Sequence, residues 1–155
     1  TLPAMYDGWF KPDFNADDWQ SGKAPIGIGE FKKGNTRFPA QSAWGDGEFL
    51  LARTTFEVAT LDYDIYRLRV MSNQGYHVYL NGRKIHTYIW WKDDPRYWKL
   101  EMSDDEAKLL KRGSNTLAVY TNVEFPSAMK PHRWTQDKLG QIDAYIEGLR
   151  KSDLY

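Results

Sequence analysis

The chain has 155 residues, which suits one domain large enough to bury a hydrophobic core. Lys and Arg number 21, as do Asp and Glu, so the chain has no basic surplus to bind nucleic acid or an anionic membrane. There is no cysteine, which excludes disulfides and thiolate metal sites, and no apolar run of the ~20 residues that a membrane span needs.

Glycines and prolines recur through residues 1–48, which leaves room only for short strands and turns. Aromatic residues recur in the same stretch, from Trp9 to Trp44, and indicate a packed loop region rather than a linker. The chain opens on Thr1 rather than on Met, without a signal sequence. We interpret residues 1–155 as a single domain that is a fragment of a larger protein.

Regular strand patterns begin at residue 49. Residues 49–58, 66–72 and 97–102 each predict a strand, and residues 115–121 predict a largely apolar, central one. Aromatic residues make up 15% of the chain, and large rings favour half-buried pleated surfaces. For any one of these aromatic side chains, packing in the core is a simpler interpretation than contact with a ligand. The pattern therefore predicts an all-β class.

Asn81-Gly82 predicts a hairpin turn. The runs before and after it, residues 76–80 and 83–90, are rich in strand-forming residues. A two-residue type I′ turn needs positive φ at both central positions, which Asn and Gly tolerate best. We therefore expect two antiparallel strands joined at this dipeptide.

Two helices are expected. Ser103 followed by three acidic residues predicts the start of a short helix at residues 104–111, ended by Gly113. The second would cover residues 135–151, in which apolar residues follow helical spacing despite two glycines: Leu139, Ile142, Tyr145, Ile146 and Leu149.

Four motifs carry a family resemblance. FNADDW at residues 14–19, followed by APIG at 24–27, resembles the "FDDSxW…aPlG" opening of galactose-binding-like jelly-roll domains attached to β-galactosidases and other family 2 glycoside hydrolases. LARTTFEV at 51–58, VYLNG at 78–82 and LLKRGSNTLAV at 109–119 resemble three further elements of these domains, in the same order. The resemblance implies an antiparallel two-sheet β-sandwich, a jelly roll, in a secreted or periplasmic protein. The expected C-terminal helix departs from the family, which closes with another core strand.

No catalytic constellation is visible. The paired carboxylates at residues 17–18, 93–94 and 104–105 occupy turns or a helix start, where Asp is expected for structural reasons. The three histidines, His77, His86 and His132, show no metal-ligand spacing, and a solvated strand position is the better interpretation for His77. A glycine-rich phosphate loop is absent as well. We expect neither a cofactor nor a metal site.

The residues between the hairpin and the strand at 97–102 have the character of a binding site. We call residues 88–98 the aromatic segment; its candidate carbohydrate-binding residues are Tyr88, Trp90, Trp91, Lys92, Arg96 and Trp98. If Ile85, Thr87 and Ile89 face the core, strand alternation turns Tyr88 and Trp90 outward. Exposed rings and an arginine fork suit a binding site. Packing of the tryptophans on a sheet edge or on the C-terminal helix is the competing interpretation.

Three functions remain open. The first is a non-catalytic accessory domain of a glycoside hydrolase that binds glycan weakly or braces the catalytic domain. The second is a structural domain without a sugar site, in which the aromatic segment docks on a neighbouring domain; a flat apolar patch would favour it over the first. The third is an enzyme in its own right, which the missing catalytic constellation disfavours. The expected partners are a carbohydrate and neighbouring domains of the same protein.

Overall fold

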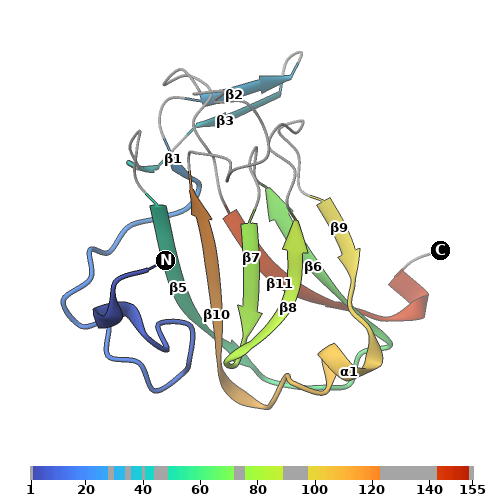
Figure 1. Ribbon diagram of the computed structural model, residues 1–155. Coiled ribbons are helices and arrows are strands. Elements are labelled where there is room, and N and C mark those ends of the chain that lie inside the picture. The colour runs from blue at the N-terminus through green and yellow to red at the C-terminus, as the bar shows by residue number, and fades with distance from the viewer. Residues whose placement is uncertain are drawn as a thin grey trace.

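Two antiparallel sheets form the body of the protein in the computed structural model, which describes residues 2–27, 30–33, 36–39, 41–43, 49–71, 76–88, 98–122 and 143–153 (Figure 1). The larger sheet has the order β5 (Phe49–Val58), β10 (Gly113–Asn122), β7 (Tyr76–Leu80), β8 (Arg83–Tyr88). The smaller has the order β11 (Asp143–Leu149), β6 (Ile65–Met71), β9 (Trp98–Glu101). The all-β sandwich expected from the sequence is confirmed, and β10 is central as predicted.

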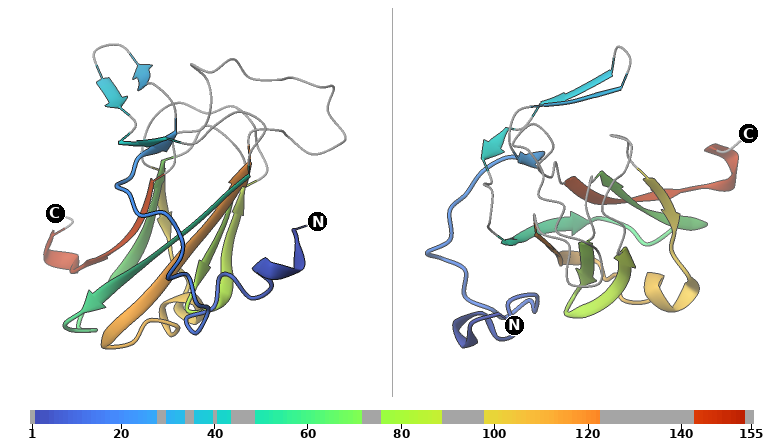
Figure 2. Two further views of the ribbon diagram at one scale, coloured as in Figure 1. Left: turned by 90° about the vertical axis from the view of Figure 1, so that its left-hand side faces the viewer. Right: turned by 45° about the horizontal axis from the view of Figure 1, so that its top comes forward.

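The core lies between the two sheets, whose layers are visible in Figure 2. Alternate residues of each strand point into it, because successive side chains of a strand face opposite sides. On β6 and β7 the inward residues are almost fully buried: Leu68, Val70, Tyr76, Val78 and Leu80. Leu117 and Val119 of β10 and Met102 and Leu110 beyond β9 complete the cluster.

The predicted hairpin is confirmed, with one irregularity. Asn81 and Gly82 have φ of 49° and 88°, the positive values that a type I′ turn requires. Farther along, Tyr79 pairs with Lys84 but Val78 pairs with His86, so Ile85 is an extra residue in β8. Such a β-bulge moves every later residue of the strand to the other face.

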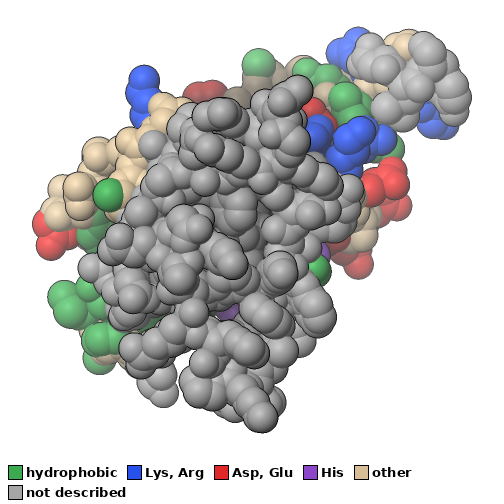
Figure 3. Space-filling view, turned by 90° about the horizontal axis from the view of Figure 1, so that it is seen from above, with side chains coloured by type: hydrophobic (Ala, Val, Ile, Leu, Met, Phe, Trp, Pro, Cys, Tyr) green, Lys and Arg blue, Asp and Glu red, His purple; other side chains and the backbone are tan. Residues whose placement is uncertain are grey.

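Short elements fill the N-terminal third of the chain. They are a 3-10 turn η1 (Ala4–Tyr6) and four strands, β1 (Ile26–Gly27), β2 (Glu30–Lys33), β3 (Thr36–Pro39) and β4 (Ser42–Ala43). β1 and β4 pair in parallel, and β2 and β3 form an antiparallel hairpin above the sandwich (Figure 1). Figure 3 looks down on this end, where described acidic and basic side chains lie near one another at the rim.

The helix expected at residues 104–111 is shorter, α1 (Asp104–Ala107). Ser103 caps it: the Glu106 backbone N–H donates to Ser103 Oγ at 3.2 Å, and the Ser103 N–H donates to Glu106 Oε1 at 2.9 Å. This capping box explains why the predicted start is right. Within the described parts of the chain, no helix is long and apolar enough to cross a membrane.

The prediction of a C-terminal helix is wrong. Residues 143–149 form strand β11, which pairs along its whole length with β6, and a 3-10 turn η3 (Lys151–Asp153) follows. Ala144 and Ile146 pack against the core, whereas Tyr145 between them is 41% exposed. The same residues that follow helical spacing thus also alternate as a strand does. Pairing with β11 gives the backbone N–H and C=O groups along one edge of β6 their hydrogen-bond partners. The stabilisation from this pairing outweighs a weak local preference for helix. The described part of the C-terminal region thus closes the smaller sheet with a strand rather than a helix; residues 135–142 lie outside the described parts.

Two asparagines, the half-buried Asn81 and the buried Asn115, join the hairpin turn to the segment before β10. Asn115 is 1% exposed, and its Oδ1 accepts from Asn81 Nδ2 at 2.9 Å and from the Lys111 N–H at 3.0 Å. Its Nδ2 donates to the carbonyl oxygens of Lys111 at 2.8 Å and Gly113 at 3.1 Å. Asn81 in turn accepts from the Thr116 N–H at 2.8 Å. Both family-like asparagines are thus structural, with their hydrogen-bonding capacity largely satisfied.

Candidate functional site

The aromatic segment is only partly described. Tyr88 ends β8, and the backbone of Trp98 begins β9, opposite Val70 of β6. Trp90, Trp91, Lys92 and Arg96 lie outside the described residues. The structure therefore neither assembles nor separates these side chains, and the binding site expected there stays a prediction.

Tyr88 does not face outward as expected. It is half-buried and packs against the core, with its ring centroid 5.6 Å from that of the buried Tyr76. Thr87, expected in the core, is exposed. The bulge at Ile85 is the reason, because the extra residue reverses the inward and outward positions that simple alternation assigns. Tyr88 thus packs against the core, contrary to the outward position expected from alternation.

The N-terminal strap, residues 3–22, covers part of the outer face of the larger sheet. Trp9 is 3% exposed, and its ring meets Tyr79 of β7 edge-on at 5.5 Å. Phe10 stacks on the same ring at 4.3 Å. Ala118, which pairs with Tyr79 across the sheet, is fully buried although it points away from the core. The strap is therefore packed onto the sheet rather than loosely tethered.

Arg53 of β5 anchors the strap. Its Nη1 donates hydrogen bonds to the carbonyl oxygens of Trp9 and Lys11, the second at 2.7 Å, and its guanidinium lies 5.5 Å from the Phe14 ring centroid. Burial lowers the pKa of Arg53, and nearby Asp13 opposes this with a smaller effect. The arginine remains a cation, and the strap holds one of its nitrogens in place.

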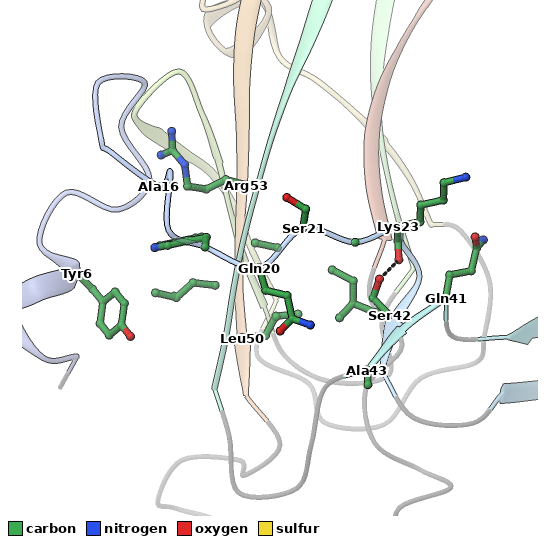
Figure 4. A pocket seen from close by; sticks show the side chains of 15 residues that line it. Tyr6, Ala16, Gln20, Ser21, Lys23, Gln41, Ser42, Ala43, Leu50 and Arg53 are labelled. Atoms are coloured by element: carbon green, nitrogen blue, oxygen red, sulfur yellow. Dashed lines mark hydrogen bonds between the residues drawn. The ribbon is translucent and has the colours of Figure 1, made fainter.

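A pocket of about 840 Å³ lies where the strap leaves the sheet and approaches β4 (Figure 4). Small-molecule sites occupy about 300 to 1,000 Å³, so its size is in the usual range. One wall comes from the strap, the other from β1 and β4, and the floor from the start of β5. The lining includes aromatic, polar and aliphatic side chains, among them Tyr6, Trp19, Gln20, Gln41, Ser42 and Leu50.

Hydrogen bonds tie β4 and the residue before it to the segment between the strap and β1. Ser42 Oγ donates to the Lys23 carbonyl oxygen at 2.7 Å, and the Gln41 N–H donates to the Pro25 carbonyl oxygen at 2.8 Å. Gly22 permits this approach, since a Cβ at that position would clash with Ser42. The pocket thus depends on contacts between segments that are far apart in the chain.

The pocket combines an apolar floor with a polar rim. Leu50, Leu51 and Ala52 line the floor and are half-buried, whereas Gln20 and Gln41 at the rim are exposed. Half-buried Trp19 adds a ring, held edge-on by Tyr6 at 6.4 Å and by Phe14 at 5.6 Å. Apolar surface with a few convergent polar groups is typical of ligand sites.

A second polar cluster lies on the outer face of the larger sheet. His77 Nδ1 lies 3.1 Å from Thr87 Oγ1, and its ring stacks on Tyr120 at 5.7 Å. Burial lowers the pKa of His77, and Lys84 lowers it further, so the neutral imidazole is favoured. The expected solvated position is therefore half-buried. In the described residues, no group of three or more His, Asp or Glu side chains could hold a metal ion.

Reasoning from sequence missed the pocket residues. Gln20, Gln41 and Ser42 belong to the irregular first third of the chain, where no periodic pattern predicts a face. The one available signal was Trp19, whose motif points to the strap but not to the opposite wall.

Comparison with known proteins supports the fold. No protein-family model matches the chain, and no curated protein matches it. Among solved structures, the chain is similar to the crystal structure of a β-glycosidase from Bacteroides vulgatus, with a TM-score of 0.51 and 14% sequence identity. The similarity covers 88% of this chain and 18% of the β-glycosidase chain, so this chain matches only a small part of that protein. The protein is a β-sandwich whose fold resembles part of that β-glycosidase.

Proposed function

We propose that the chain is a non-catalytic accessory domain of the galactose-binding-like kind, part of a larger carbohydrate-active protein. The supporting observation is the extent of the structural similarity: nearly all of this chain matches less than a fifth of a β-glycosidase. That proportion is expected when the whole of one chain corresponds to a single domain of a longer, multidomain enzyme. The four family-like motifs support the same proposal.

The roles of the motif residues fit an accessory domain. Asn81 and Asn115 hydrogen-bond to each other, Arg53 anchors the strap, and Trp19 packs on neighbouring rings. These residues stabilise the sandwich, so the resemblance concerns its architecture more than any chemistry. A fold of this kind hosts many functions, and the activity of a parent protein need not reside in it.

Within this proposal, the domain binds a glycan weakly or braces the neighbouring catalytic domain. Weak binding is expected because the pocket is open, and dissociation constants on the order of 10⁻⁶ to 10⁻³ M correspond to about −8 to −4 kcal/mol. The resemblance further supports a secreted or periplasmic protein, which fractionation of the producing cells would test.

Two measurements on the purified chain test the proposal. The chain should bind at least one oligosaccharide of a broad panel by isothermal titration calorimetry, and it should release no nitrophenol from a panel of aryl-glycosides. Turnover that disappears when one carboxylate is replaced would show an enzyme instead. Absence of binding across the panel would leave the bracing role, the structural alternative, as the function.

A further inference from the structure

We propose that the pocket between the strap and β4 is the glycan site of this domain, and that its ligand is a short neutral oligosaccharide. The inference rests on the proposed function and adds a location and a ligand class to it. It places the site away from the aromatic segment, whose first ring, Tyr88, packs into the core.

The rim matches the hydrogen-bonding needs of sugar hydroxyls. A hydroxyl both donates and accepts, and a glutamine amide offers two donors and an acceptor on one short group. Gln20 and Gln41 stand on opposite sides of the pocket; the floor residue Leu50 lies beside Gln20, and Ser42 lies on the side of Gln41 (Figure 4). Ser42 contributes a hydroxyl whose hydrogen is already donated to the Lys23 carbonyl, which leaves its oxygen as an acceptor. A sugar in the pocket would therefore have polar groups within the same pocket on two of its sides.

The floor and one wall match the apolar face of a pyranose. Trp19 offers a half-buried ring on the strap side, and Leu50 and Ile26 are half-buried aliphatic neighbours. Rings of this kind give large contact areas with little loss of conformational entropy, because they have two side-chain torsions. Neighbouring rings fix Trp19 edge-on, so the platform is arranged before a ligand arrives.

The charges around the pocket favour an uncharged ligand. Two of its lining residues are cations, Lys23 and Arg53. The guanidinium of Arg53 is directed to the strap, where carbonyl oxygens hold Nη1, and the ammonium of Lys23 points away from Gln20 (Figure 4). The guanidinium of Arg53 is thus held away from a ligand bound between the two glutamines, and the Lys23 side chain lies on the Gln41 side of the pocket (Figure 4). None of the described lining residues is acidic.

The test is calorimetric titration of the purified chain with neutral and uronic-acid oligosaccharides, before and after changes in the pocket. The double variant Gln20→Ala/Gln41→Ala removes exposed amides and should keep the fold, as circular dichroism would verify. We expect neutral oligosaccharides to bind at least about tenfold more weakly to it, the loss that one or two hydrogen bonds produce. Binding to the wild type should change little between 50 and 500 mM salt, roughly the range over which screening weakens charge–charge contacts.

Two control variants identify the site. Lys108→Ala/Ser114→Ala removes two exposed polar groups outside the pocket and should bind like the wild type. Trp90→Ala, in the aromatic segment, should also bind like the wild type. If Trp90→Ala abolishes binding while Gln20→Ala/Gln41→Ala retains it, the pocket proposal is wrong and the accessory function stands.

Further outcomes separate the two proposals. Binding only of uronic-acid oligosaccharides, with affinity falling as salt rises, would overturn the neutral ligand class but keep a glycan-binding domain. If the wild type binds no glycan at all, both the pocket site and glycan binding by this domain are refuted. Loss of neutral-glycan binding in the glutamine double variant alone supports the pocket.

Discussion

Replacing Asn115 with alanine should be among the most destabilising single changes in this protein. The side chain is 1% exposed and makes four hydrogen bonds, to Asn81, to the Lys111 N–H and to the carbonyl oxygens of Lys111 and Gly113. Alanine removes the four bonds together and leaves their partners to find other hydrogen bonds in a partly buried place. The hairpin turn would also lose its link to the segment before β10.

The expected loss follows from the number of bonds. A typical intramolecular hydrogen bond contributes about 1 kcal/mol net, so four give about 4 kcal/mol. A natural domain is stable by about 5 to 15 kcal/mol, so this change removes a large part of the total. With a urea m-value of about 2 kcal/mol/M, the unfolding midpoint should fall by about 2 M.

Equilibrium urea unfolding, followed by tryptophan fluorescence and far-ultraviolet circular dichroism, measures this shift. The matched control is Asn15→Ala, because Asn15 is exposed and accepts one hydrogen bond, from the Asp17 N–H at 2.9 Å. It should change stability by about 0.5 kcal/mol or less, as most surface changes do. A midpoint shift for Asn115→Ala no larger than that of the control would refute the reasoning.

Asn115→Asp gives an independent check with a defined pH dependence. An ionised carboxylate keeps the acceptor for the Lys111 N–H but faces the two carbonyl oxygens that Asn115 Nδ2 binds. The folded state should therefore raise the pKa of the new carboxyl, so its destabilisation relative to wild type should be large at pH 7 and smaller at pH 4. An identical deficit at both values would contradict this account of the network.

Three further predictions concern the strap, β11 and a half-buried histidine. Arg53→Met should lower stability by about 2 kcal/mol, since bonds to a charged donor are lost, and limited chymotrypsin digestion should cut within the aromatic-rich strap first. Gly148→Ala should cost about 1 to 3 kcal/mol, because a Cβ there would lie 2.6 Å from the Tyr63 ring, and a Tyr63→Leu background should reduce that cost in a double-mutant cycle. Burial lowers the pKa of His86 below its usual 6.5 despite nearby Glu106, so stability should fall as pH drops below about 6.5, and His86→Leu should flatten that fall in pH-dependent thermal melts.

Features decided by neighbouring residues could be predicted from the sequence. The turn at Asn81-Gly82 and the start of α1 depend on side chains within three residues of each other, and both are correct. The strands from β5 to β10 were recognised because alternation and turn residues agree with the fold that they enter.

Features decided by tertiary contacts could not be predicted in this way. The residues of β11 have helical spacing over a longer window, and their strand state depends on pairing with β6, far away in the sequence. The outward position assigned to Tyr88 failed because one bulged residue, Ile85, reverses a strand's faces and has no local signature. The pocket combines Gln20, Gln41 and Leu50 from three segments, none of which is periodic at that point.

The place of β11 also determines the order in which the chain can fold. Arg69 of β6 and Glu147 of β11, whose ion pair measures 3.1 Å, are 78 residues apart in the sequence. All four strands of the larger sheet have left the ribosome before β11, so that sheet can form while the smaller one has, of its described strands, just β6 and β9. Until the last strand arrives, one edge of β6 offers unpaired backbone groups to any extended segment nearby. Long-range closure of this kind slows folding, so a nascent chain that stalls before residue 143 should be prone to aggregate.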